Sequence, residues 1–161
     1  MANDIKKLLN SLQKQPNFSI MHFSENEQFI NEIKEFCKDE CSEYRVISFD
    51  KNNLIKLNKY SDNITKIQYL DPLKKKYSMH GKFYDYIFVN SLYKDRETFF
   101  KRVYSALKNG ALMFIFLEKN KREKAYKIES ELIENNYVAT SLIDLDEYLI
   151  ISAKKMHGWG S

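Results

Sequence analysis

The stretch SALKNGALMFIFLEK, residues 105–119, combines the end of a helical pattern with the start of a strand-like one. Its consecutive apolar residues, 111–117, lack the alternation of a half-buried strand, so they predict a strand covered on both faces. Residues 97–108 place apolar side chains at helical spacing. We expect Asn109-Gly110 to close that helix, because glycine readily takes the left-handed backbone found at helix ends. The stretch therefore predicts a helix followed by a central or near-central strand.

Upstream of this stretch, short apolar segments alternate with helical patterns. The strand-like segments are FSIMHF (18–23), YRVISFD (44–50), ITKIQYLDP (64–72) and YDYIFVN (84–90). The helical patterns lie within residues 5–12, 24–37 and 54–57, and residues 73–82 form a polar connection. Because crossover helices join parallel strands, this alternation predicts a parallel sheet in which YDYIFVN pairs with the apolar run.

Downstream, a charged helix over residues 121–136 precedes two strand-like segments, TSLIDLD and YLIISAKK. A very short connection near Asp146-Glu147 joins them, which indicates an antiparallel hairpin. The whole order predicts an α/β fold of the doubly wound class. We expect a mostly parallel, seven-stranded sheet with helices on both faces and a C-terminal antiparallel hairpin.

Composition favours one globular domain over residues 1–161, with an N-terminal helix in 1–16 and a tail over 156–161. The aromatic content of 14% excludes a disordered chain. No apolar run is long enough to span a bilayer, and the N-terminus lacks the apolar centre of a signal peptide, so we expect a cytoplasmic protein. The tail holds the only tryptophan, Trp159. It could anchor an interface, tuck over the sheet edge or be disordered.

The net charge of +4 and the lysine clusters at 74–76 and 119–124 permit contact with nucleic acid. Solvated lysine faces are the commoner explanation, and no motif that reads RNA or DNA accompanies the charge. Nucleic-acid binding therefore rests on charge alone.

Cys37 and Cys41 lie four residues apart, which on a helix would place both on one face. Half of a metal site and two reduced thiols are the alternatives. We favour reduced thiols and expect no metal, since no second cysteine pair or nearby histidine completes a site. His22, His80 and His157 have no evident partner acids, so we expect structural or solvent-facing roles for them.

Three segments, YDYIFVN, SALKNGALMFIFLEK and NNYVATSLIDLDEYLIISAKK, resemble the fourth strand, the fifth strand with its leader and the closing hairpin of one family. That family is the class I S-adenosylmethionine (SAM)-dependent methyltransferases. The resemblance covers residues 17–155. It implies a SAM site at the carboxyl ends of the first four strands, where open α/β sheets place ligands.

The family's glycine-rich loop is matched here by His22 to Glu27, which contains no glycine. We expect Ser24 to cap the following helix and Glu27 to complete a capping box, while Ser24 holds the family's cofactor-binding position. Any side chain there fills space that the methionine part of SAM occupies in the family. The resemblance therefore implies SAM affinity that is absent or far weaker than the family's.

Asp50 and Asp71 match the family's acids for the ribose hydroxyls and the adenine, although strand-end aspartates are also common turn formers. We expect both at the same sheet edge as Ser24. The tetrapeptide Asn90-Ser91-Leu92-Tyr93 resembles the Asn/Asp-Pro-Pro-Tyr/Phe motif of amino-methyltransferases at its first and last positions. Asn90 and Tyr93 are thus candidate catalytic residues, and a strand-ending Asn before a packed Tyr is the alternative.

Three functions remain open at this point. The chain could be a SAM-dependent methyltransferase with an altered cofactor loop. It could be a non-catalytic binding or interaction module on the same fold, with a protein partner or a second copy as its ligand. A nucleic-acid-binding domain is the third.

Overall fold

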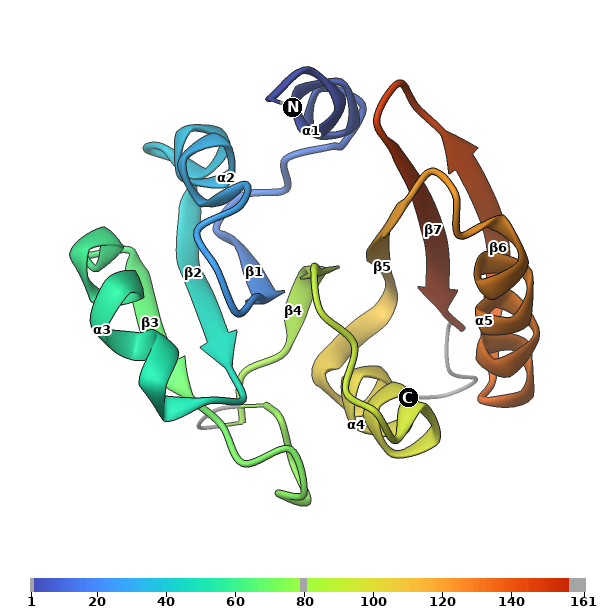
Figure 1. Ribbon diagram of the computed structural model, residues 1–161. Helices are drawn as coiled ribbons and strands as arrows, with labels where there is room; N and C mark the ends of the chain where they lie inside the picture. The colour runs from blue at the N-terminus through green and yellow to red at the C-terminus, as the bar shows by residue number, and fades with distance from the viewer. Residues whose placement is uncertain (1, 79–80, 157–161) are drawn as a thin grey trace.

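A computed structural model describes residues 2–78 and 81–156 of the chain (Figure 1). The helices are α1 (Ala2–Asn10), α2 (Ile30–Cys37), α3 (Leu54–Leu57), α4 (Arg96–Ala106) and α5 (Arg122–Glu134), with short 3-10 turns η1 (Lys51–Asn53) and η2 (Asn58–Tyr60). The strands are β1 (Phe18–Phe23), β2 (Cys41–Ser48), β3 (Thr65–Tyr69), β4 (Tyr84–Val89), β5 (Leu107–Glu118), β6 (Tyr137–Asp144) and β7 (Tyr148–Lys155).

The strands form one sheet in the order β3-β2-β1-β4-β5-β7-β6. Strands β1 to β5 pair in parallel, whereas β7 runs antiparallel to both β5 and β6. Strand β5 lies between β4 and β7, and its residues 113–117 are buried, so the near-central strand covered on both faces that the apolar run predicted is confirmed. The predicted fold class, with its parallel sheet and closing antiparallel hairpin, is confirmed as well.

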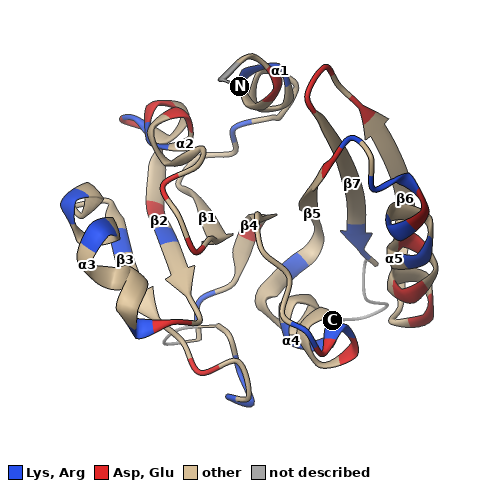
Figure 2. Ribbon diagram, in the orientation of Figure 1, with Lys and Arg blue, Asp and Glu red and all other residues tan. Residues whose placement is uncertain are grey.

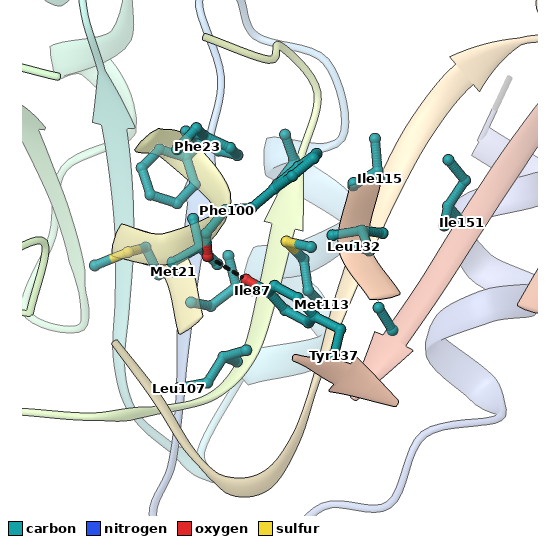
Figure 3. Packing of buried hydrophobic residues seen from close by; sticks show 14 of the residues in the cluster. Met21, Phe23, Ile87, Phe100, Leu107, Met113, Ile115, Leu132, Tyr137 and Ile151 are labelled. Carbon is teal, nitrogen blue, oxygen red and sulfur yellow. Dashed lines mark hydrogen bonds between the residues drawn. The ribbon is translucent and has the colours of Figure 1, made fainter. Parts of the chain in front are cut away.

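Helices cover both faces of the sheet, with α1, α2 and α3 on one face and α4 and α5 on the other (Figure 1). Alternate residues of each strand supply two separate apolar cores. On the face of α4 and α5, Met21, Ile87 and Met113 pack beneath Phe100 (Figure 3). The buried Tyr137 hydroxyl donates a hydrogen bond of 2.7 Å to the Phe100 carbonyl, which ties β6 to α4.

The turn at Asn109-Gly110 differs from the prediction. Helix α4 already ends at Ala106, and Leu107 has extended backbone angles. Asn109 and Gly110 lie inside β5, where the pairing with β4 jumps from Leu107 opposite Tyr84 to Leu112 opposite Tyr86. Gly110 does take the left-handed backbone, with φ 80°, but it serves this bulge. Leu107 is fully buried, so its burial favours an early start of the strand.

The N-terminal helix is held by the hairpin at the other end of the chain. Asp4 is buried in α1, and its carboxylate accepts hydrogen bonds from the backbone N–H groups of Glu147 and Tyr148, at 2.7 and 3.0 Å. These two residues belong to the β6–β7 turn and the start of β7. The segment predicted as an N-terminal helix is therefore fastened to the sheet. Over the described residues, no helix has both the length and the apolar character needed to cross a membrane.

Candidate functional site

Four candidate residues follow the carboxyl ends of four parallel strands. Ser24 follows β1, Asp50 follows β2, Asp71 follows β3 and Asn90 follows β4. Because these strands are parallel, the four residues lie along one edge of the sheet. The prediction that Asp50 and Asp71 share the edge of Ser24 is confirmed. The strand order reverses between β1 and β4, and open α/β sheets bind ligands at such a point.

The capping box predicted for Ser24 and Glu27 is wrong. Helix α2 begins only at Ile30, and the Ser24 hydroxyl instead bonds within its own turn, donating to the Asn26 carbonyl at 2.7 Å. Glu27 forms an ion pair with Lys59, whose hydrogen bond lowers the pKa of the Glu27 carboxyl. The turn is thus closed locally by Ser24, whereas Glu27 pairs with Lys59 of η2.

The late start of α2 follows from the burial of Phe29. This residue precedes the helix with a left-handed backbone, φ 72°, and makes no side-chain cap. Its ring centroid lies 4.8 Å from that of Phe116 and 5.4 Å from that of Tyr148. Apolar contact with β5 and β7 therefore offsets the cost of the backbone angle, and it overrides the local capping signal.

Glu25 links the turn after β1 to the end of β2. One carboxylate oxygen accepts from the Ser48 hydroxyl and from the Asn53 amide, the latter at 2.9 Å. The other accepts from the backbone N–H of Phe49 at 2.9 Å. Three donors from β2 and its following turn thus converge on one half-buried carboxylate.

Asp50 and Asp71 are exposed, and each shapes its own turn. The Asp50 side chain accepts from the Asn52 N–H at 2.9 Å, which caps η1. The Asp71 side chain accepts from the Leu73 N–H at 3.0 Å. Both contacts are of the turn-forming kind that the sequence left open as an alternative. Binding of a ribose or an adenine by these acids stays a prediction.

Asn90 joins β4 to the turn after β1, across the reversal of the strand order. Its side-chain amide donates to the Ser24 hydroxyl at 3.2 Å and to the Gln28 carbonyl at 3.0 Å. Its backbone N–H donates to the Phe23 carbonyl at 2.9 Å. The Asn90 side chain is therefore engaged by the turn after β1, and its role in catalysis stays a prediction.

His22 lies fully buried beneath this edge. Its Nδ1 is hydrogen-bonded to the Tyr44 hydroxyl at 2.7 Å, and the two rings stack with centroids 6.0 Å apart. Burial lowers the pKa of His22 to about 4, partly opposed by the neighbouring Asn90 side chain. The imidazole is therefore neutral at pH 7, and its predicted structural role is borne out by these contacts. His80 and His157 lie outside the described residues, as does Trp159.

An aromatic cluster fills the edge on the side of α4. Phe49, directly after β2, lies 5.5 Å from Phe23, 6.0 Å from Tyr77 and 5.8 Å from Tyr93, between ring centroids. Phe99 of α4 closes the group at 5.0 Å from Phe23. Tyr77 is buried, and its hydroxyl donates to the Pro72 carbonyl at 2.7 Å. Tyr93 is thus packed against a neighbouring ring; its role in catalysis stays a prediction.

One of the two lysine clusters, residues 119–124, has acidic neighbours. Both acidic and basic residues occur along α5 and α2 (Figure 2). Lys119 and Arg122 both form ion pairs with Asp144. The segment 119–124 therefore presents a mixed surface, which weakens the argument for nucleic acid from charge.

Sequence reasoning missed the role of Glu25. Its partners, Ser48, Phe49 and Asn53, lie more than twenty residues away, so no local spacing pattern connects them. The one available signal was an acid in a turn where the resembling family has glycine.

No protein-family model matches the sequence, and no curated protein matches it. Solved structures do match. One is a chain of the complex between the Haloferax volcanii Trm112 methyltransferase activator and the putative methyltransferase, with a TM-score of 0.74 at 9% identity, covering 98% of this chain and 90% of that one. A putative SAM-dependent methyltransferase from Listeria monocytogenes gives 0.69 at 12% identity, covering 97% and 99%. Haemonchus contortus phosphoethanolamine N-methyltransferase 2, in complex with SAM, gives 0.69 at 12%, covering 96% and 52%.

At these identities the likeness shows the fold alone. The fold is that of the class I SAM-dependent methyltransferases, as the resemblance of the three sequence segments implied.

Proposed function

We propose that this chain is a non-catalytic binding module on the methyltransferase fold, with SAM affinity absent or far weaker than that of catalytic members. The observation that carries the proposal is the Glu25 carboxylate, which joins the turn after β1 to the end of β2. The alternative is a working methyltransferase that holds SAM through an altered loop.

The residues of this edge do not fit SAM well. The turn matching the family's glycine loop carries Glu25, whose charge repels the carboxylate of SAM's methionine moiety. Moving Glu25 aside would break its bonds to Ser48, Phe49 and Asn53. Losing hydrogen bonds to a charged group costs about 2 kcal/mol or more, which corresponds to roughly thirtyfold in affinity.

Two further features support a closed edge. Asn90 lies where the strand order reverses and hydrogen-bonds from the end of β4 to Ser24 and Gln28. The ring of Phe49 packs between Phe23 and Tyr93. A ligand at this position would have to displace both a polar and an aromatic contact. One open cavity among the described residues lies elsewhere, between α2 and the amino end of β3, where Asn31, Lys34 and residues 62–65 belong to its lining.

A protein partner is part of this proposal. The Haloferax volcanii complex pairs a methyltransferase activator with a putative methyltransferase, so a chain of this fold is a precedent for association with another protein. Nucleic acid receives less support, because Lys119 and Arg122 are paired with Asp144.

Calorimetric titration of SAM into the unaltered protein tests the proposal. We expect no stoichiometric binding with a Kd tighter than about 1 mM, and no rise in melting temperature. Tight, stoichiometric binding would instead establish a cofactor site without glycines and favour a working methyltransferase. A parallel titration with duplex DNA and RNA at varied salt is expected to show no salt-dependent binding.

Glu25→Gly and Glu27→Gly form a matched pair for this test, since both place a glycine in the same turn. Glu25→Gly should lower the free energy of unfolding by about 2 kcal/mol through its lost hydrogen bonds. Glu27→Gly should cost clearly less, because it removes only a solvent-screened surface ion pair with Lys59. Only Glu25→Gly should gain any SAM affinity. Equal effects of the two substitutions on stability and SAM binding would argue against a special role for Glu25.

A further inference from the structure

Helix α1 is fastened to the β6–β7 hairpin by a buried carboxylate. Asp4 is only 1% exposed, and its Oδ2 accepts hydrogen bonds from the backbone N–H groups of Glu147 and Tyr148 at 2.7 and 3.0 Å. Its Oδ1 is also buried and has no hydrogen-bond partner among the described residues. Because one buried oxygen is left unpaired, desolvation offsets part of what the two hydrogen bonds contribute. The fastening of α1 is therefore specific in geometry and modest in free energy.

Tyr148 connects the hairpin to the carboxyl edge. It begins β7 and pairs with Glu118 at the carboxyl end of β5. While its backbone N–H donates to the Asp4 carboxylate, its hydroxyl accepts a hydrogen bond from the Gln28 side-chain amide. Its ring centroid lies 5.4 Å from that of Phe29. One residue thus contacts α1 through its backbone and the turn after β1 through its side chain.

Gln28 carries the connection to the point where the strand order reverses. Its carbonyl accepts from the Asn90 side-chain amide at 3.0 Å, and the same amide donates to the Ser24 hydroxyl at 3.2 Å. The Gln28 N–H donates to the Asn26 side-chain oxygen at 3.0 Å. A chain of hydrogen bonds therefore runs from α1 through the start of β7 to the turn after β1 and the end of β4.

Apolar packing couples the same parts of the molecule. Ile5, Leu8 and Leu9 of α1 are buried in the core cluster that also contains Phe29 and Phe116. Phe29 holds a left-handed backbone angle, which persists only while its surroundings fix it. Figure 1 shows α1 beside α2 and the tip of the β6–β7 hairpin. The helix therefore belongs to the packing that fixes Phe29.

We propose that α1 is a strap that regulates the closed carboxyl edge on which the proposed function rests, with Asp4 as the positioning residue through which it acts. Loss of the Asp4 hydrogen bonds frees the start of β7, so that Tyr148 no longer fixes Gln28 and Phe29. The turn over residues 24–29 then opens more often to solvent. The strap thereby changes the population of the open edge without being part of that edge.

Hydrogen–deuterium exchange of the intact, folded protein, measured without SAM, tests this strap. Asp4→Ala should speed amide exchange over residues 24–30 by about tenfold or more, because two hydrogen bonds to a charged group are lost. Residues 112–117 of β5 should keep their protection, since the core does not depend on the strap. Asp4→Asn should recover most of the protection at 24–30, because its side-chain oxygen can still accept from the hairpin.

Two further variants separate the strap from a general loss of stability. Lys7→Ala removes an exposed ion pair of 3.4 Å with Asp146, which also joins α1 to the hairpin, and it should leave exchange at 24–30 unchanged. Tyr148→Phe removes the hydroxyl while keeping the ring and the backbone N–H. It should speed exchange at 24–30 and leave residues 2–10 protected, and it tests the strap even if Asp4→Ala does not fold.

Several outcomes would overturn the proposal. Faster exchange of the Asp4→Ala protein confined to α1 and the hairpin would show that Asp4 acts only locally. Equal acceleration at residues 112–117 would show that it acts only on overall stability. An equal effect of Lys7→Ala would assign the link to surface charge, and unchanged exchange at 24–30 in Tyr148→Phe would exclude the hydroxyl as the connection. Since no SAM is present, each outcome is independent of whether the chain binds the cofactor, which the calorimetric titration tests separately.

Discussion

Strands β4 and β5 and the turns at the carboxyl edge are held in place by different kinds of contact. Ile87, Met113 and Ile115 are fully buried in the core beneath α4 and α5. At the edge, single polar side chains such as Glu25 and Asn90 connect neighbouring turns. Burial summed over many side chains defines the sheet, so the edge can change its chemistry while the fold persists.

This difference explains how a methyltransferase fold can carry a turn without glycines. The glycines of the resembling family serve a ligand rather than the packing of the sheet. Here Glu25 occupies that turn and Phe29 follows it before α2, while the apolar cores on both faces of the sheet persist. Three substitutions test the contrast between core and edge, from the largest expected effect to the smallest.

Phe100→Ala tests the core. Phe100 is fully buried in α4 and faces the sheet (Figure 3), so truncation should lower the free energy of unfolding by about 4 kcal/mol through lost burial and a cavity. Phe83→Ala is the matched control, since Phe83 is 46% exposed, and its effect should stay within about 0.5 kcal/mol. Urea denaturation measures both. Similar losses for the two variants would contradict a core that depends on burial.

The second prediction concerns His22, a polar residue that is buried at the boundary between the core and the carboxyl edge. Its pKa is about 4 in the folded protein against 6.5 for an ordinary histidine, so the unfolded chain binds a proton at higher pH than the folded one. The stability that the neutral His22 side chain gives to the folded state is therefore fully present above pH 6.5. It is lost as the pH falls toward 4. At pH 5 the loss relative to pH 8 should be about 2 kcal/mol.

His22→Gln removes the titration while keeping a polar partner for Tyr44. Urea denaturation of both proteins at several pH values between 5 and 8 gives the difference in slope. Parallel curves for the two proteins would show that the imidazole titrates alike in the folded and unfolded states.

The third prediction concerns Asp50 at the carboxyl edge, where we expect the smallest effect on stability. Asp50→Ala removes the cap of η1 and should lower the free energy of unfolding by about 1 kcal/mol. Asp50→Asn should stay within a few tenths of a kcal/mol, roughly the difference between two good caps, because its side-chain oxygen can still accept from the Asn52 N–H. Equal stability of both variants in urea, with loss of measurable SAM binding in each, would instead identify Asp50 as a cofactor ligand.

Much of the architecture follows from the sequence by itself. The apolar run 111–117, the alternation of strands with helical patterns and the closing hairpin predicted the sheet, its parallel core and its antiparallel edge. Each of these signals is a local period of apolar residues, and burial acts on that period directly. The parallel direction of the strands then brought Ser24, Asp50, Asp71 and Asn90 to one edge.

Only the tertiary structure decided what those edge residues do. The capping box predicted at Ser24 does not form, because Phe29 packs against Phe116 and Tyr148, which belong to strands distant in the sequence. Glu25 accepts hydrogen bonds from Ser48 and Phe49 at the end of the neighbouring strand β2. Polar side chains choose among many partners of similar strength, and the choice depends on which distant atoms the packed sheet brings near.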